Sequence, residues 1–374
     1  MICVPVVLEK NTKSVMENSE IKKLEDLGYD DFFESNRKLL KLDNFSVARV
    51  IVEYRGLYKV KNIGGEYFAK ITGKQMFNAL SREDYPAVGD WVAITELGEE
   101  QAVIQGILPR KTIIKRKRIN KNETQIIATN IDVAFVVESV DSDFSLNRFE
   151  RYFAIANDGG VKPAIILNKI DLISKEELDL KVSQIKNRFN NIDIVLSSTK
   201  TNEGLEEFKK YILARKTYCF LGSSGVGKSS LINKLFNEDV IKTGDISLYS
   251  GKGKHITTSR EMYFLKNGGI VIDNPGMREV GMTDTGTGID NFFDEITELA
   301  KGCKYADCTH THEAGCKVLL AVESGKLDKD KYSNYVNLKK ESEYYEMTEI
   351  DKRQKDRQFG KFLKKAKESF EKYK

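Results

Sequence analysis

The chain has 374 residues and a formal net charge of +4, and 31% of its residues are charged. This length exceeds the size at which one hydrophobic core keeps growing, so we expect two or three domains. The mean hydropathy of −0.42 and the lack of a long apolar run exclude a membrane-spanning segment, and we expect a monomer with no membrane partner.

Residues 1–44 are expected to form an N-terminal extension. Residues 1–8 are apolar but run into Glu9 and Lys10 with no basic segment before them, which is a poor match to a secretory signal peptide. The stretch 21–43 predicts a helical element ahead of the first domain.

Residues 45–112 predict an OB-fold domain. Short runs rich in β-branched and aromatic residues alternate with turn signals, which gives strand candidates at 45–54, 57–60, 66–72, 90–95 and 101–108. Five short strands in so little chain are typical of a small barrel that binds oligonucleotides. Its aromatic residues either stack on bases or belong to the core, and the core is the more frequent place for them: Tyr54, Tyr58, Tyr67 and Phe68.

A basic connector follows the barrel. Arg110, Lys111 and the run from Lys115 to Arg118 lie between it and the next domain. Contact with a phosphate backbone would explain this charge, and so would a solvated linker.

Residues 113–285 carry the first motif of a nucleotide site, Asn168-Lys169-Ile170-Asp171, directly after a buried-strand pattern at 163–167. Ligands of α/β sheets bind at the carboxyl ends of the strands. The motif resembles the guanine-reading box of GTPases, in which Asp171 would accept hydrogen bonds from the guanine N1 and N2 groups. Asn168 would then brace the loop, Lys169 would cover the base, and adenine would pair badly. A second strand at 191–196 leads to Ser197 and Ser198, at the place of the G5 loop.

A phosphate loop comes later, where Gly222 to Ser229 fits G-x-x-x-x-G-K-[ST]. A β-prone run at 217–221 precedes it and a helical pattern follows Lys228, which is the arrangement that anion binding requires. Lys228 would interact with the β- and γ-phosphates and Ser229 with Mg²⁺. We assign the whole segment to the nucleotide: Gly222, Ser223, Ser224, Gly225, Val226, Gly227, Lys228, Ser229 and Ser230.

The order of these two motifs is informative. In Ras-like domains the phosphate loop comes first and the guanine box later, whereas here the guanine box precedes the loop by about fifty residues. The sequence therefore predicts a circularly permuted α/β GTPase domain.

Two segments after the phosphate loop are expected to sense the γ-phosphate. Asp273 ends a strand pattern and begins a D-x-P-G motif, in which Gly276 would meet the γ-phosphate. The basic stretch 251–258 contains Thr257, which we predict to bind Mg²⁺ together with Ser229 and Asp273. A surface loop is the alternative interpretation of 251–258.

The motifs contain no glutamine to orient the attacking water. Ras-like proteins use a glutamine shortly after D-x-P-G, but Met277 stands there, and a thioether cannot position water. His255 is the candidate, since imidazole can pair with water near neutral pH. Lys228 is the second predicted catalytic residue. His255 could instead contact RNA or solvent. We expect slow turnover until a partner completes the site.

Residues 286–374 predict a zinc-binding and basic helical domain. Three of the five cysteines of the chain gather with histidine in the pattern Cys303, Cys308, His310, Cys316. Three thiolates and one imidazole make a closed, structural Zn²⁺ site; His312 is the alternative to His310. Cysteines gathered for a metal suggest a reducing cytoplasm. Beyond residue 339 basic residues outnumber acidic ones, which suits either RNA phosphates or a solvated helix face.

Taken in this order, the barrel, NKID, GSSGVGKSS, GKGKHITT, DNPG, the Cys–His cluster and the basic tail resemble the RsgA family, also called YjeQ or YloQ. The resemblance spans roughly residues 25–367. It implies a GTPase that docks on the small (30S) ribosomal subunit and its rRNA late in maturation, and that the subunit stimulates. Ile256 stands where the family often has threonine, and Asn274 fills the variable place of D-x-P-G.

Two alternatives stay open from the residues. Met277 also suits a nucleotide-dependent RNA-binding switch with negligible hydrolysis of its own. An ATP-using enzyme could be built on the same phosphate loop, and nucleotide competition would identify it.

Overall fold

The computed structural model describes residues 21–54, 56–117, 124–141, 144–189, 191–236, 260–273, 286–347, 351 and 357. His255, Thr257 and Gly276 of the predicted switch segments, together with most of the basic tail, lie outside these ranges. Among the described residues, no helix combines the length and the apolar character needed to cross a bilayer.

The N-terminal domain is a closed five-stranded barrel of the OB type. Its strands are β1 (Ser46–Glu53), β2 (Tyr58–Asn62), β3 (Gly65–Ile71), β4 (Trp91–Glu96) and β5 (Gln101–Ile107). Each pairs with its neighbour in the order β1-β2-β3-β5-β4, and β4 pairs back onto β1 to close the barrel. The five strands predicted from short runs rich in β-branched and aromatic residues are therefore confirmed. The helices α2 (Gly73–Asn78) and η2 (Arg82–Asp84) lie between β3 and β4.

A short helical segment packs on the outer face of the barrel. It consists of η1 (Leu24–Leu27) and α1 (Asp31–Leu39), where Asp30 caps α1 by accepting a hydrogen bond from the backbone of Phe32. Leu27 and Phe33 pack with Trp91 of the barrel in one buried cluster. The predicted helical extension is thus present, as two short helices that cover the outer face of β1 and β4.

The GTPase domain is built on a sheet in the order β10-β9-β8-β11-β13-β12. All neighbouring pairs are parallel except β12–β13. The strands are β8 (Val133–Ser139), β9 (Lys162–Asn168), β10 (Ile194–Ser197), β11 (Thr217–Leu221), β12 (Arg260–Phe264) and β13 (Ile270–Asp273). β11, which leads to the phosphate loop, lies between a strand that precedes it in the chain and one that follows it. The strand before the phosphate loop is therefore not the first strand of the GTPase sheet in the chain, which confirms the predicted circular permutation.

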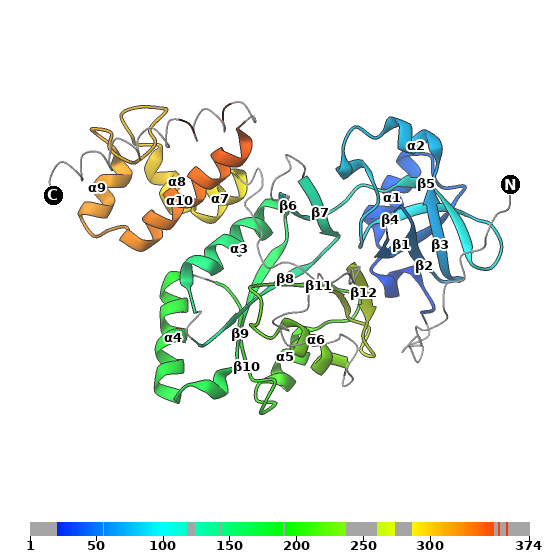
Figure 1. Ribbon diagram of the computed structural model, residues 1–374, viewed down its shortest axis with the longest axis horizontal. Coiled ribbons are helices and arrows are strands. Elements are labelled where there is room, and N and C mark those ends of the chain that lie inside the picture. Colours follow the sequence, from blue (N-terminus) through cyan, green and yellow to red (C-terminus); the bar gives the residue numbers. More distant parts are fainter. Residues whose placement is uncertain are drawn as a thin grey trace.

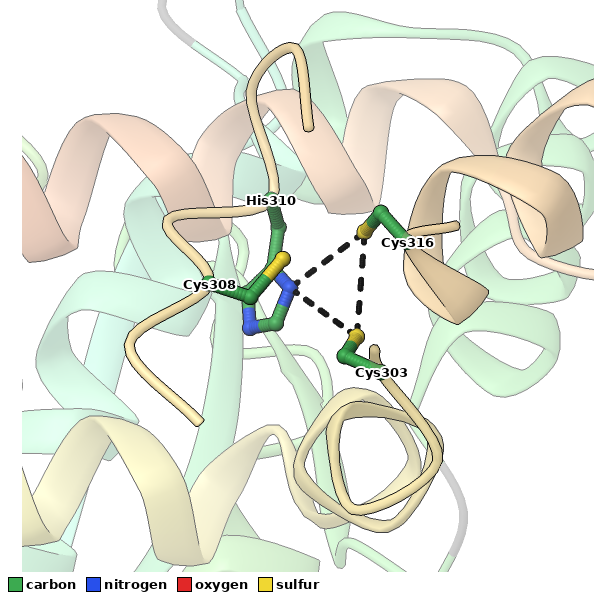
Figure 2. Close-up of side chains that lie close together, drawn as sticks. All are labelled: Cys303, Cys308, His310 and Cys316. Atoms are coloured by element: carbon green, nitrogen blue, oxygen red, sulfur yellow. Dashed lines mark hydrogen bonds between the residues drawn. The ribbon is translucent and has the colours of Figure 1, made fainter. Parts of the chain in front are cut away.

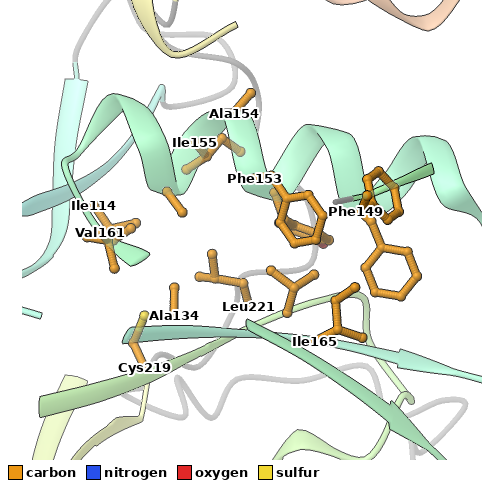
Figure 3. Packing of buried hydrophobic residues seen from close by; sticks show 14 of the residues in the cluster. Ile114, Ala134, Phe149, Phe153, Ala154, Ile155, Val161, Ile165, Cys219 and Leu221 are labelled. Atoms are coloured by element: carbon orange, nitrogen blue, oxygen red, sulfur yellow. The ribbon is translucent and has the colours of Figure 1, made fainter. Parts of the chain in front are cut away.

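Alternating side chains of the central strands belong to two hydrophobic cores on opposite faces of the sheet. Ile165 and Leu167 of β9 belong to the core with α3 (Leu146–Asp158) and α4 (Lys175–Arg188), whereas Ala164 and Ile166 belong to the core with α5 (Leu205–Tyr211) and α6 (Lys228–Phe236). Phe149 and Phe153 of α3 lie over the sheet on the first face (Figure 3). A strand buried on both faces has this continuous apolar pattern.

The C-terminal module consists of α7 (Gly286–Phe292), α8 (Asp294–Ala300), α9 (Lys317–Glu323) and α10 (Lys329–Glu346), and it packs on α3 (Figure 1). Gly288 allows close approach, because a Cβ there would lie 2.4 Å from the carbonyl oxygen of Ala154. The buried carboxylate of Glu150 pairs with Arg188 at 2.7 Å and also accepts from Asn334 of α10. A buried charge of this kind is tolerated only because both partners are in place.

Buried polar groups join the barrel to the GTPase domain. The guanidinium of Arg49 is fully buried and donates to the carbonyls of Leu27 and Asn130 and, at 2.9 Å, to Thr217 Oγ1. Burial lowers the pKa of Arg49 to about 10. Asp90, which accepts a bidentate pair from Arg110 at 2.8 and 2.7 Å, also accepts a hydrogen bond from Thr129 Oγ1 of the GTPase domain at 2.7 Å. The two domains are therefore connected by buried hydrogen bonds to several elements.

The basic connector is part of this joint. It forms β6 (Ile113–Lys117), which pairs with β7 (Thr124–Thr129) in a hairpin. Lys111 pairs with Asp30, and Lys115 pairs with Glu83 at 2.6 Å. Like Arg110, these lysines therefore contact carboxylates that lie at or near the barrel.

Gly89 is a sensitive point of the joint. It has φ +100°, and a Cβ there would lie 2.1 Å from the carbonyl oxygen of Thr129 at the end of β7. We expect Gly89→Ala to lower the free energy of unfolding by about 3 kcal/mol or more, since it adds a backbone clash to left-handed strain.

The matched control is Gly98→Ala. Gly98 has φ +88° but nothing within 4 Å of the added Cβ, so it isolates the strain, expected at about 1 kcal/mol. Urea unfolding of both variants measures the difference, and equal losses would show that the close approach to Thr129 does not matter.

Candidate functional site

The phosphate loop runs from the end of β11 to the start of α6. Lys228 Nζ donates to the carbonyl oxygens of Gly222 at 2.7 Å and Ser223 at 2.5 Å, so the loop is folded around its own lysine. Gly222 has φ +141°, and a Cβ there would lie 2.2 Å from the carbonyl oxygen of Val137 on β8. Only glycine fits this position, which explains the first glycine of the motif.

Asn168 connects the guanine box to the phosphate loop. Its Nδ2 donates to the carbonyl oxygen of Val226 at 2.8 Å, and its Oδ1 accepts from Ser197 Oγ at 3.1 Å. A Cβ at Gly227, which has φ +98°, would lie 2.3 Å from Asn168 Nδ2. Two motifs more than fifty residues apart are therefore held together by one buried amide.

Asp171 lies beside the G5 loop. Its Oδ1 accepts a hydrogen bond from Ser198 Oγ at 2.6 Å, and Ser198 Oγ accepts in turn from the backbone N–H groups of Lys200 and Thr201. The Asp171 side chain is 12% exposed. One carboxylate oxygen is thus fixed by the protein while the group still reaches the surface of the site, which suits recognition of a ligand with adjacent N–H donors.

Two partners of the site have no counterpart in the sequence motifs. Asp141 accepts from Lys169 Nζ at 3.0 Å and from Ser139 Oγ at 2.8 Å, and Lys169 itself has φ 62°. Tyr152 of α3 shares a hydrogen bond with Ser223 of the phosphate loop, and burial raises the pKa of the Tyr152 hydroxyl. Asp141 comes shortly after the buried strand β8, and a carboxylate at such a strand end is a signal that the sequence contains. No sequence signal points to Tyr152.

Asp273 ends β13, next to β11, so its backbone lies at the same edge of the sheet as the phosphate loop. Its partner across the antiparallel pair is Glu261 of β12. Ser229 and Ser230 lie in the first turn of α6. The structure thus gathers the described members of the predicted site: the guanine box, the G5 serines, the phosphate loop and Asp273.

The predicted zinc ligands form a compact cluster (Figure 2). One ligand atom from each of Cys303, Cys308, His310 and Cys316 lies within 4.8 Å of the others. His310 Nδ1 is 3.6 Å from the Sγ of Cys303 and 3.5 Å from that of Cys316, and the two sulfurs are 3.8 Å apart. A tetrahedron with Zn–S bonds of about 2.3 Å has edges of about 3.8 Å, so the residues fit a zinc ion.

The loop that carries His310 is braced from both sides. Glu313 accepts hydrogen bonds from the Thr309 hydroxyl and from the backbone N–H groups of Thr309, Thr311 and His312, which hold its pKa well below the usual range. Burial lowers the pKa of His310, which favours the neutral, metal-binding imidazole. His312 is exposed and hydrogen-bonds Thr311 instead, outside the cluster.

The barrel aromatics divide into two groups. Tyr58 and Tyr67 are buried in the barrel core, at 5% and 6% exposure. Tyr54 and Phe68 are exposed, with ring centroids 6.5 Å apart. Only the second pair is available for stacking on a ligand.

Comparison with known proteins identifies a family that matches most of this chain. A profile of the family described as RsgA GTPase matches residues 107–283. A protein of Lactiplantibacillus plantarum named small ribosomal subunit biogenesis GTPase RsgA 2 is 39% identical over 326 residues, which cover 86% of this chain and 91% of its relative. The chain belongs to the RsgA GTPase family. It is therefore a GTPase that hydrolyses GTP.

Other relatives agree with this membership. A Bacteroides thetaiotaomicron protein named small ribosomal subunit biogenesis GTPase RsgA 1 is 34% identical and covers 91% of this chain and 95% of its own length. The crystal structure of YjeQ from Thermotoga maritima aligns with TM-score 0.58 and 26% identity over 78% of this chain and 96% of that chain. YloQ, described as a circularly permuted GTPase, aligns with TM-score 0.57 at 23% identity and supports the fold alone.

A second profile, described as 50S ribosome-binding GTPase, matches residues 217–356. It begins at β11, the strand before the phosphate loop, whereas the RsgA profile begins ahead of the guanine box. The two starting points reflect the permuted order of this family.

Proposed function

We propose that this chain is a GTPase that binds the small ribosomal subunit, acts in its late maturation and hydrolyses GTP faster when bound to it. The names of its relatives support this partner: the Lactiplantibacillus plantarum and Bacteroides thetaiotaomicron proteins, which match over most of their length, are called small ribosomal subunit biogenesis GTPases. The rRNA of the subunit is the proposed contact, the cytoplasm the proposed location and a monomer the proposed state.

For the nucleotide we propose the roles that the motifs imply. Asp171 reads guanine, Lys169 covers the base, and the loop from Gly222 to Ser230 surrounds the phosphates. Ser229, Thr257 and Asp273 hold Mg²⁺, which supplies charge neutralisation at the phosphates. His255 orients water and Gly276 meets the γ-phosphate. The hydrogen bonds of Asn168 and Ser198 support the guanine part of this proposal.

For the metal we propose one structural Zn²⁺ on Cys303, Cys308, His310 and Cys316. The interatomic distances of the cluster support it. No coordination position is left for a substrate, so its role is to hold the C-terminal module together. We divide the chain accordingly into an extension (1–44), barrel (45–112), GTPase domain (113–285) and zinc module (286–374).

Titration with ribosomal subunits tests the partner. We expect purified small subunits to raise the rate of phosphate release from GTP by about tenfold or more, since a partner can complete a GTPase site that lacks a water-orienting glutamine. Large subunits serve as the control, because one matching profile carries a 50S description. Stimulation by large subunits alone, or by neither, would contradict the proposal.

A further inference from the structure

The barrel and the GTPase sheet share a hydrogen-bonded ladder. β1 of the barrel pairs with β12, with Val52 opposite Glu261 and Glu53 opposite Arg260. On its other edge β12 pairs with β13, where Glu261 is opposite Asp273. Figure 1 shows β12 at the side of the sheet that faces the barrel. A barrel residue and the proposed Mg²⁺ ligand Asp273 are therefore only two strands apart in one line of the ladder.

A side-chain ion pair stands at the start of β12. Arg260 Nη1 lies 3.1 Å from Glu53 Oε2 and also donates to the carbonyl oxygen of Ile126 at 2.9 Å. The Arg260 side chain is 12% exposed and that of Glu53 29% exposed. The first residue of β12 is thus attached both to the barrel strand β1 and to the hairpin strand β7.

This attachment differs from the rest of the joint. Arg49 donates to Thr217 and Asn130, and Asp90 accepts from Thr129, so these groups hold the barrel in place without touching β12. Between β1 and β12, by contrast, the ladder has two residue pairs. With β13, the same strand has four. The Arg260 contacts therefore contribute much of what ties the start of β12 to the barrel, and losing them leaves the barrel attached.

We propose that Arg260 and Glu53 are positioning residues for GTP hydrolysis. They fix the start of β12 against the barrel, and so place Asp273, which pairs with Glu261 of β12, for the metal that accompanies GTP. Arg260 also follows Thr257, the other switch-side metal ligand proposed above, by three residues. A small displacement of a positioned group can slow an enzyme strongly. The inference rests on the GTPase activity of the family and on the proposed role of Asp273, and it does not depend on a ribosomal partner.

The test has two readouts without ribosomal subunits. One is steady-state GTP hydrolysis at a series of Mg²⁺ concentrations, and the other is calorimetric binding of Mg²⁺ to the complex with a non-hydrolysable GTP analogue, which should weaken by about threefold or more in the variants and does not depend on turnover. For Arg260→Ala and Glu53→Gln we expect a roughly tenfold lower kcat and a rise of about threefold or more in the Mg²⁺ concentration that gives half-maximal rate. KM for GTP at saturating Mg²⁺ should change little. Arg260→Lys should recover most of the rate, because an ammonium group still pairs with Glu53.

Glu341→Gln is the matched control. Glu341 pairs with Arg151 across the interface between the GTPase domain and α10. Its side chain is 26% exposed, which is similar to the 29% exposure of the Glu53 side chain. We expect its kcat and Mg²⁺ dependence to stay within about twofold of the unmodified protein, since this pair lies outside the β1–β12–β13 ladder.

Three results would overturn the proposal. The first is an Arg260→Ala protein that melts normally and keeps its rate and Mg²⁺ dependence. The second is an equal loss in Glu341→Gln, which would indicate a general effect of any interdomain pair. The third is unchanged kinetics in Glu53→Gln. This variant decides the question if Arg260→Ala fails to fold, because the amide keeps the size of the side chain. A lack of stimulation by small subunits would instead count against the proposed function alone.

Discussion

Asp171→Asn is expected to reverse the nucleotide preference of this protein. The guanine N1 and N2 groups are donors, and the amide nitrogen of asparagine would face them with a donor of its own. We expect affinity for GTP to fall by about a hundredfold or more. Affinity for xanthosine triphosphate should rise, because xanthine carries an acceptor oxygen where guanine has its amino group. Competition against a fluorescent GTP analogue measures both.

The substitution should leave the fold unchanged. Asparagine keeps an Oδ1 that can accept the hydrogen bond from Ser198 Oγ. Asp193→Asn is the control: its carboxylate pairs with Lys162 at 3.0 Å on the surface, and residue 193 precedes β10 instead of following a strand into the site. If Asp171→Asn binds GTP as tightly as the unmodified protein, Asp171 does not read guanine.

Loss of one cysteine of the cluster is expected to remove the zinc and unfold the C-terminal module. Cys316→Ser is the most informative change, because Cys316 also caps α9 by accepting a hydrogen bond from the backbone of Leu319. Serine is a good helix cap but a poor zinc ligand. The variant therefore separates the two roles. We expect zinc content to fall from about one ion per chain to nearly none, with a loss of roughly 5 kcal/mol or more in the stability of the module.

Metal analysis and thermal unfolding, with and without a chelator, check this expectation. His312→Ala is the control, since His312 is exposed, lies next to the binding loop and contacts Thr311. It should keep its zinc and its melting temperature. Full zinc content in Cys316→Ser, or its loss in His312→Ala, would contradict the assigned ligand set.

Much of the site could be predicted because its motifs are local. The phosphate loop needs glycines where the backbone has positive φ or approaches another strand, as at Gly222 and Gly227, and such requirements leave a mark on neighbouring residues in the sequence. The same holds for the spacing from Cys303 to Cys316, because a metal ion constrains a short stretch of chain.

Supporting contacts could not be predicted in the same way. Asp141 fixes Lys169 from a different strand, and Tyr152 reaches Ser223 from α3. Neither residue belongs to a recognisable motif, because a single hydrogen bond between distant elements can be made by many residue types at many positions. The connector from Arg110 to Lys115 was ambiguous for a related reason, since its charge is compensated by carboxylates elsewhere in the chain.

The sequence by itself determined the strands of the barrel, the permuted order of the GTPase motifs and the four residues of the cluster, since periodicity and spacing are properties of contiguous residues. Tertiary structure alone decided that β1 of the barrel pairs with β12, and that Arg49 and Arg260 bind groups in both domains. Pairing of two strands about two hundred residues apart depends on which edges the folded domains present to each other, and local sequence does not encode that.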